Sequence, residues 1–188
     1  MKKFFLFVWE ITKVVAVSLA IILPVRYFLI QPFYVKGDSM EPNFHDNEYL
    51  IIDELSYRFQ EPARGQVIVF RYPLYPQEYF IKRIIALPGE DVEIKDGSVF
   101  VYNQENHEGF RLNESYLPSG LQTFSHNEGK IQVGQGEYFV LGDNRGTSRD
   151  SRAFGPVDQS YLTGKVFLRG WPFSRFTLFN SGYWPQYN

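Results

Sequence analysis

The sequence predicts a mainly β domain that follows one N-terminal membrane helix. Three observations carry this prediction. The first 30 of the 188 residues are dominated by apolar side chains. After Pro32 the pattern changes to short apolar runs that end at glycine, proline or aspartate, as strands and their turns do. The pair Asp96-Gly97 lies between two such runs and is a strong short-range signal for a β-hairpin.

Residues 1–30 are expected to form a membrane anchor. Their uninterrupted apolar part, residues 14–23, is shorter than the roughly 20 residues that cross a bilayer. The longer stretch 4–30 is sufficient, and its Glu10 and Lys13 are spaced to pair on one helix face. A buried or interfacial helix and a cleaved signal peptide are the alternatives. The second lacks a small-x-small cleavage site after the apolar run.

The basic residues around this segment predict its orientation. Three lysines precede the apolar part, whereas only Arg26 and Lys36 follow it closely. Basic residues accumulate on the cytoplasmic side of a membrane, so the N-terminus is expected in the cytoplasm. Residues 31–188 then form an extracytoplasmic domain.

Within this domain, short apolar runs mark the expected strands. The hairpin is formed by residues 91–95 and 98–101, and residues 158–162 fit a single helical turn. Residues 103–135 are polar and form either a small lobe or a long loop. The other expected strands are residues 66–70, 138–141 and 165–168.

Composition excludes several classes of function. The net charge is −2, which disfavours a nucleic-acid-binding protein because such proteins carry a basic excess. With no cysteine, the chain has neither thiol nucleophiles nor cysteine–zinc sites. His45, His107 and His126 lie far apart without the spacing of metal ligands, so we expect no metal or cofactor.

Nucleophilic catalysis would therefore use serine or threonine with an unusual base, such as lysine. A lysine has a pKa near 10.4 and becomes a base only where burial disfavours its charge. Lys82 fits best because it lies in the apolar run of residues 79–87, YFIKRIIAL. The alternative is a Lys–Arg pair on a solvated strand.

Two further segments contain candidate residues. Ser39 lies in the sequence GDSMEP, where Gly37 permits a sharp turn that exposes backbone N–H groups. Residues 142–152, GDNRGTSRDSR, can hold a fixed shape through Asp–Arg pairs. Read separately, these segments also fit an ordinary turn and a solvated charged loop.

Taken together, four segments resemble the bacterial type I signal peptidases, which are membrane-bound Ser-Lys leader peptidases. Residues 37–42 resemble the nucleophile box S-M-x-P, and residues 64–70 resemble the strand R-G-D-I-V-V-F. Residues 82–90 resemble K-R-x-x-x-x-P-G-(D/E), and residues 142–152 resemble G-D-N-R-x-x-S-x-D-S-R. The segments occur in the family's order and extend from the anchor to about residue 170.

The resemblance implies that Ser39 is the nucleophile and Lys82 the general base of a serine endopeptidase. It further implies a body of two antiparallel sheets with an inserted polar β lobe, 103–135. The substrates would be exported preproteins, cut after small residues at −3 and −1, and bound as a strand along residues 79–87 or a neighbour. The supporting residues would be Ser148, which orients the lysine, the Asp150–Arg152 ion pair, Gly142, which lets the lysine approach, and Gly37.

This sequence departs from the family pattern at a few positions. Gln66 replaces a frequent aspartate, and Gly146 and Thr147 replace frequent aspartate and asparagine. Gly37 replaces the hydroxyl residue that gives some members a second oxyanion donor. Ser39 follows the anchor closely, so the site should lie at the bilayer surface, where aromatic residues are expected at the interface. They are Phe28, Phe33, Tyr34 and Phe44.

Three other functions compete with this interpretation. A self-cleaving Ser-Lys repressor would need a DNA-binding module and an upstream scissile bond, and the segment before Ser39 is apolar instead. A processing enzyme dedicated to one substrate has the same sequence features as a general one. A tethered β domain without activity predicts that Ser39 and Lys82 need not meet.

Overall fold

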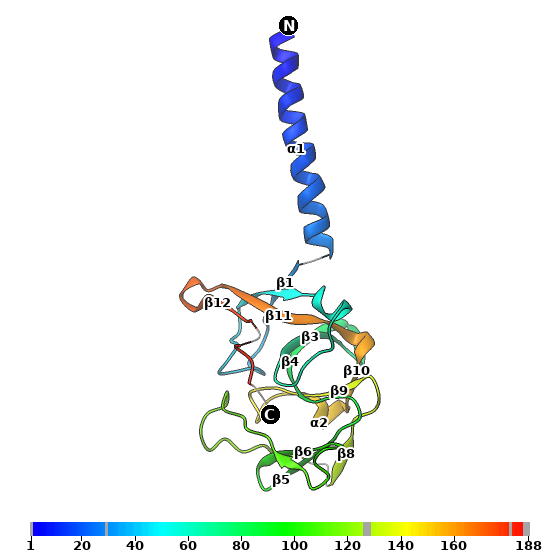
Figure 1. Cartoon of the computed structure of the whole chain (residues 1–188). Coiled ribbons are helices and arrows are strands. Elements are labelled where there is room, and N and C mark those ends of the chain that lie inside the picture. The colour runs from blue at the N-terminus through cyan, green and yellow to red at the C-terminus, as the bar shows by residue number, and fades with distance from the viewer. Residues whose placement is uncertain (1, 29, 126–128, 181, 186–188) are drawn as a thin grey trace.

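The computed structural model describes residues 2–28, 30–125, 129–180 and 182–185, and for residues 23–28 and 30 the backbone alone. Its first element is the helix α1 (Lys2–Phe28), which projects away from the body (Figure 1). The part Lys2–Ile22 is long and apolar enough to cross a membrane, and none of it is buried. Lys13 Nζ and Glu10 Oε1 lie 2.7 Å apart, so the two charges inside the apolar stretch pair with each other.

The body is built on an eight-stranded antiparallel sheet. It begins at β1 (Ile30–Tyr34) and β2 (Tyr49–Asp53), which lie at the end of the body nearest α1 (Figure 1). The spatial order is β1-β2-β11-β3-β4-β9-β10, and β12 pairs with β11. The remaining strands are β3 (Val67–Tyr72), β4 (Tyr75–Ala86), β9 (Glu137–Leu141), β10 (Val157–Asp158), β11 (Leu162–Trp171) and β12 (Thr177–Leu178).

A second antiparallel sheet lies at the opposite end of the body from α1 (Figure 1). Its four strands have the order β7-β6-β5-β8, namely β7 (Phe110–Arg111), β6 (Ser98–Tyr102), β5 (Asp91–Lys95) and β8 (Lys130–Gln132). Asp96 and Gly97 have φ values of 51° and 72°, the left-handed conformation of a two-residue hairpin turn. The mainly β prediction and the predicted hairpin are both confirmed. The sheet also takes in β5 and β6, which precede the polar stretch 103–135.

Helical structure in the described part of the body is limited to single turns. They are η1 (Ser56–Arg58), α2 (Ser151–Phe154), η2 (Gln159–Tyr161) and η3 (Phe173–Arg175). The helical turn expected at residues 158–162 is confirmed as η2, which the Asp158 side chain caps by accepting from the Ser160 N–H.

Strand β4 passes through the interior, which decides whether Lys82 and Arg83 lie on a solvated strand. Lys82 is 3% exposed and Arg83 2% exposed, so the solvated Lys–Arg strand is wrong. The two faces of β4 meet different apolar clusters, because Ile81 packs against the core around β2 and β3, whereas Ile84 belongs to the cluster that contains Ile68 and Phe70. Burial on both sides is what places a cationic side chain in the core.

The residues expected at the membrane interface differ in how far they are exposed. Phe44 is completely buried and stacks on Phe179 with ring centroids 5.2 Å apart, so the expectation for Phe44 is wrong. The turn after Ser39 folds inward and places the Phe44 side chain in the core. Tyr34 is 48% exposed, Phe33 is partly buried, and the Phe28 side chain lies outside the described residues.

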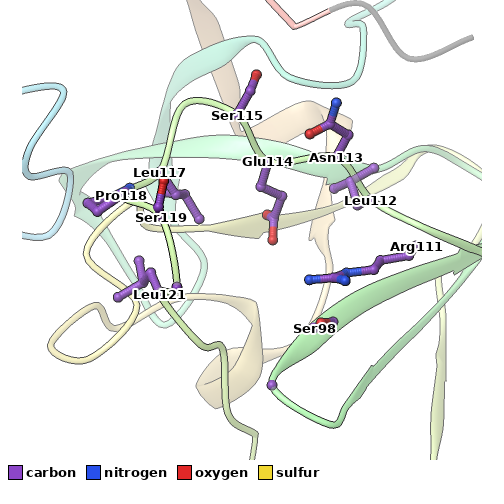
Figure 2. Close-up of a pocket in the computed structure, with 12 residues that line it drawn as sticks. Ser98, Arg111, Leu112, Asn113, Glu114, Ser115, Leu117, Pro118, Ser119 and Leu121 are labelled. Atoms are coloured by element: carbon purple, nitrogen blue, oxygen red, sulfur yellow. The ribbon is translucent and has the colours of Figure 1, made fainter.

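The polar stretch 103–135 includes a hollow of about 610 Å³. Figure 2 shows that the chain from Arg111 to Leu121 curls around it, with Ser98 of β6 on the opposite wall. The wall residues are mostly polar and include Asn113, Glu114 and Ser115. Neither Ser39 nor Lys82 lines this hollow.

Candidate active site

The structure brings Ser39 and Lys82 together from positions 43 residues apart in the chain. Lys82 Nζ lies 2.8 Å from Ser39 Oγ and donates a second hydrogen bond of 2.7 Å to the Ile81 carbonyl. Ser39 belongs to a tight turn in which the Glu41 N–H donates to Asp38 O and the Phe44 N–H to Met40 O. Lys82 comes from the middle of β4, so a short turn and a buried strand form the contact.

The surroundings of Lys82 favour its neutral form. Burial lowers the pKa of Lys82 from 10.5 to about 8, although the charges of Asp150 and Asp143 act in the opposite direction. At pH 7 about one tenth of the amine is then neutral. The Phe80 ring centroid lies 5.3 Å from Nζ and forms part of the apolar wall. This amine can accept a proton near neutral pH, which an exposed lysine cannot.

The backbone at Ser39 offers a hydrogen-bond donor beside the hydroxyl. Gly37 has φ +90°, which favours glycine, and its N–H donates to Asp46 Oδ1 at 2.7 Å. The Ser39 carbonyl accepts from the Asn144 N–H at 3.1 Å. The Ser39 N–H has no acceptor among the described residues. It is therefore available to stabilise an anion that develops beside Ser39 Oγ.

Gly142 lies where the loop of residues 142–152 meets the turn that contains Ser39. A Cβ atom added at this position would stand 2.0 Å from Ser148 Oγ and 2.5 Å from the Ser39 carbonyl oxygen. Ser148 Oγ is buried and makes no hydrogen bond within the described residues. The family resemblance implies that Ser148 bonds to Lys82, but Lys82 donates only to Ser39 and Ile81 in the described structure.

An ion pair holds the rest of this loop. Arg152 donates two parallel hydrogen bonds of 2.8 Å to Asp150, and the Asp150 side chain is fully buried. Asp150 Oδ2 also accepts from the Gly142 N–H at 3.0 Å, and Arg152 Nη1 donates to the Arg145 carbonyl at 2.8 Å. Such bidentate pairs fix geometry as well as charge, so the loop presents Gly142 and Ser148 in defined positions.

Comparison with known proteins identifies the family. A sequence model of the family described as "Signal peptidase, peptidase S26" matches residues 8–171, most of the chain. The chain belongs to this family. It is a signal peptidase, a serine endopeptidase that removes signal peptides from preproteins.

The two sequence relatives, from Synechocystis and Staphylococcus aureus, agree with this assignment. The "Probable signal peptidase I-2" of Synechocystis is 35% identical over 174 residues, which cover 90% of this chain and 76% of the relative. The "Signal peptidase IB" of Staphylococcus aureus is 34% identical over 173 residues, covering 86% and 88%. A crystal structure of a signal peptidase I from Enterococcus faecalis is 36% identical and covers 56% of this chain and 97% of that one, with a TM-score of 0.45.

In this signal peptidase the hydroxyl and amine of Ser39 and Lys82 lie on a groove of about 580 Å³. Its lining includes residues 33–38, which contain the end of β1, and residues 78–82 of β4. The apolar residues Val35, Leu50, Val69 and Ile81 line its interior. Strand β9 pairs with β4 from Arg83 to Ala86, so only the part before Arg83 remains as an edge for a substrate strand.

Several buried charged residues of the signal peptidase were not predicted from the sequence. Arg83 pairs with Asp143, and Arg145 pairs with Glu114 of the polar stretch. Glu48 lies between Arg169 and Arg175, at 2.8 and 2.6 Å, and burial raises its pKa. Arg83 shares the apolar sequence context that marked Lys82, but the other partners are too distant in sequence to be recognised.

The positions that depart from the family pattern have local roles. Gln66 Oε1 accepts from the Tyr57 hydroxyl at 2.9 Å and from the Ala63 N–H at 3.2 Å, which fixes the turn before β3. Thr147 lies on the groove, and Gly146 is exposed. Of the histidines, His126 lies outside the described residues. Within the described residues, no group of three His, Asp or Glu side chains is placed to hold a metal ion.

Proposed function

We propose that this signal peptidase cleaves exported preproteins with Ser39 as the nucleophile and Lys82 as the general base. The observation that carries the proposal is the 2.8 Å contact between the Ser39 hydroxyl and a lysine amine buried in the core. A tethered domain without activity would require neither the contact nor the burial. Burial of a cation costs free energy, so its presence beside a serine favours a chemical role.

The reaction follows from this contact. Neutral Lys82 takes the Ser39 proton as Oγ attacks the carbonyl carbon of the scissile bond. Collapse of the tetrahedral intermediate breaks the C–N bond, and the Lys82 ammonium gives its proton to the departing amine. Lys82 then takes a proton from water, which attacks the Ser39 ester and releases the signal peptide. The serine recovers its proton from Lys82, and the enzyme returns to its initial state.

Five supporting residues shape the site in this proposal. The Ser39 N–H stabilises the oxyanion, and the turn at Gly37 directs it into the groove. Gly142 permits the close approach of the loop to Ser39. Asp150 and Arg152 hold that loop in place. Ser148, whose buried hydroxyl makes no hydrogen bond within the described residues, is assigned the role of orienting the Lys82 amine that the family resemblance implies.

The groove fits an extended substrate segment. A strand laid between residues 33–37 and 78–82 finds free backbone groups on β4 before Arg83. Alternate side chains of such a strand would point into the apolar interior. The buried side chains of Leu50 and Val69 leave room there for small residues, which we assign to positions −1 and −3 of the signal peptide.

The proposal places the enzyme on the membrane that holds its substrates. Residues 1–30 form a single-pass anchor with its N-terminus in the cytoplasm, and residues 31–188 form the extracytoplasmic catalytic domain. The exposed aromatic side chains of Trp171, Phe173 and Phe176 support contact with the bilayer. Trp171 ends β11, and Phe173 and Phe176 follow it, at the end of the body that carries α1 (Figure 1).

Cleavage of a synthetic signal-sequence peptide in detergent tests the chemistry. We expect wild type to cut after an Ala-x-Ala sequence, and both Ser39→Ala and Lys82→Ala to lose the product. Lys95→Ala is a matched control, because Lys95 is exposed and pairs with Glu93 on the second sheet. Activity that survives in Lys82→Ala would show that another group is the base.

A further inference from the structure

We propose that Asn43 is a positioning residue that locks the nucleophile turn onto the strand that carries Lys82. The inference rests on the proposed roles of Ser39 and Lys82. Asn43 lies four residues after Ser39 and ends the turn, where its N–H donates to the Met40 carbonyl at 3.0 Å. Both its side chain and its carbonyl are held by groups from distant parts of the chain.

The side-chain amide of Asn43 donates to two acceptors from distant parts of the chain. Nδ2 lies 2.8 Å from Asp143 Oδ2, a residue 100 positions away, and 3.0 Å from the Tyr116 carbonyl oxygen. Asp143 is completely buried. An amide is the group that suits this place, because a carboxylate would repel Asp143 and an apolar side chain would take one donor away from each of the two acceptors.

Asp143 connects this contact to the base. It accepts two hydrogen bonds from Arg83, of 2.8 and 2.6 Å, and Arg83 directly follows Lys82 in β4. The Tyr116 ring covers the Arg83 guanidinium with its centroid 3.9 Å away. Asn43 therefore touches two groups that fix the backbone of β4 beside Lys82.

The carbonyl of Asn43 is held from the other side of the turn. Arg169 Nη2 donates to it at 2.6 Å and Arg175 Nη2 at 3.3 Å. Glu48 pairs with both guanidinium groups, and its side chain is 2% exposed. These charge-assisted contacts tie the turn to β11 and η3. With its amide and its carbonyl both fixed, Asn43 sets where the turn lies relative to β4.

The geometry explains why the position of the turn relative to β4 must be fixed. Ser39 and Lys82 must stay within hydrogen-bond reach, and small misplacement of reacting groups costs large factors in rate. Ser39 and Lys82 belong to elements that share no strand pairing, since Ser39 lies in the turn between β1 and β2, whereas β4 pairs with β3 and β9. The Asn43–Asp143–Arg83 path supplies a direct polar connection between them.

Kinetics of the full-length chain in detergent test the proposal. We expect Asn43→Ala and Asn43→Asp to lower kcat for a signal-sequence peptide 10- to 100-fold and to leave KM within twofold. Near-ultraviolet circular dichroism at the assay temperature verifies that each variant is folded, and rates are scaled to that fraction. Asn113→Ala is the matched control and should keep the parental kcat. Asn113 is exposed and lines the hollow of the polar stretch 103–135, which we call the lobe hollow (Figure 2).

A double-variant comparison separates positioning from a general loss of stability. If Asn43 acts through Asp143, Asn43→Ala should change kcat less than threefold when Asp143→Asn is already present. A folded Asn43→Ala enzyme with parental kcat, a loss confined to KM, or independent effects of the two substitutions would overturn the inference. The proposed function would then still stand. It fails separately if wild type cleaves no better than Ser39→Ala, and the inference fails with it.

Discussion

Gly142 lies directly against Ser148, so closely that a Cβ at position 142 would stand 2.0 Å from the Ser148 hydroxyl oxygen. The same atom would stand 2.5 Å from the Ser39 carbonyl oxygen, which is backbone and cannot rotate away. Gly142 is thus the point at which the loop of residues 142–152 fits against the turn that contains Ser39. The fit depends on the absence of a single methyl group.

Gly142→Ala is therefore expected to reduce kcat at least 100-fold, because the loop or the turn must shift and separate Ser39 from Lys82. Gly146→Ala is a close control in the same loop, since the nearest atom to a Cβ there is 3.9 Å away. Peptide cleavage and thermal unfolding of the two variants check this. Similar kcat values for both would contradict the prediction.

The activity should depend on pH through Lys82. Its pKa of about 8 means that the neutral base is lost as the pH falls below that value. We expect kcat/KM to drop about tenfold per pH unit between pH 7 and pH 5, and to approach a plateau above pH 9. A pH–rate profile in detergent measures this, with thermal unfolding recorded at each pH. A profile that is flat from pH 6 to pH 9 would argue against Lys82 as the base.

Lys82 is also expected to lower the stability of the fold. The unfolded lysine holds its proton up to about pH 10.5 and the folded one only to about 8, so stability rises with pH between these values. Below pH 8 the chain carries the whole cost of burying the charge, about 3 kcal/mol.

Lys82→Met should remove this cost. The variant should be inactive yet up to about 3 kcal/mol more stable than wild type at pH 7, with a difference that shrinks towards pH 10.5. Denaturant unfolding in detergent at several pH values provides the comparison. A variant that is less stable than wild type at pH 7 would show that the lysine is not strained in the folded state.

Contact of the body with lipid can be measured through tryptophan. Trp171 is 49% exposed and Trp184 only 5% exposed, so in a Trp9→Phe protein a quencher in the lipid acts mainly on Trp171. In vesicles whose acyl chains carry bromine, a quencher, we expect its fluorescence to fall. Adding Trp171→Phe leaves Trp184 as the control and should abolish the quenching. Equal emission in brominated and plain vesicles would exclude insertion of this surface.

Local signals predicted the parts of the fold that local chemistry decides. The Asp96-Gly97 turn and the strands on either side of it need only neighbouring residues, and they form as expected. The burial of Lys82 was suggested by its apolar neighbours. Its contact with Ser39 was expected only from the family resemblance, since nothing in the sequence links positions 43 residues apart.

The unpredicted parts depend on distant pairing. In the sequence, Asn43 looks like an ordinary turn residue. Its structural role can be seen only in the folded chain, where it bonds to Asp143, 100 positions away. Glu48 and Arg169 likewise look like surface charges in the sequence, yet both are buried. The burial of a polar residue can be predicted only when its hydrogen-bonding partner is known. The order of the strands in the sheet decides which partner that is.

The polar stretch 103–135 illustrates the same point and leads to a last prediction. Glu114 lies on the wall of the lobe hollow (Figure 2), and its carboxylate pairs with both terminal nitrogens of Arg145. Arg145 is buried and donates to the Gly142 carbonyl at 3.0 Å. The stretch therefore neutralises a cation that supports the loop beside Ser39.

Glu114→Gln removes the only full negative charge paired with Arg145 among the described ion pairs, and an uncompensated buried cation is costly. We expect the free energy of unfolding to fall by about 3 kcal/mol. Glu108→Gln changes an exposed glutamate of the same stretch and should stay within about 0.5 kcal/mol of wild type. Denaturant unfolding of both variants provides the test. A loss in Glu114→Gln no larger than in the control would mean that the stretch is a solvated appendage, without a part in holding the catalytic loop.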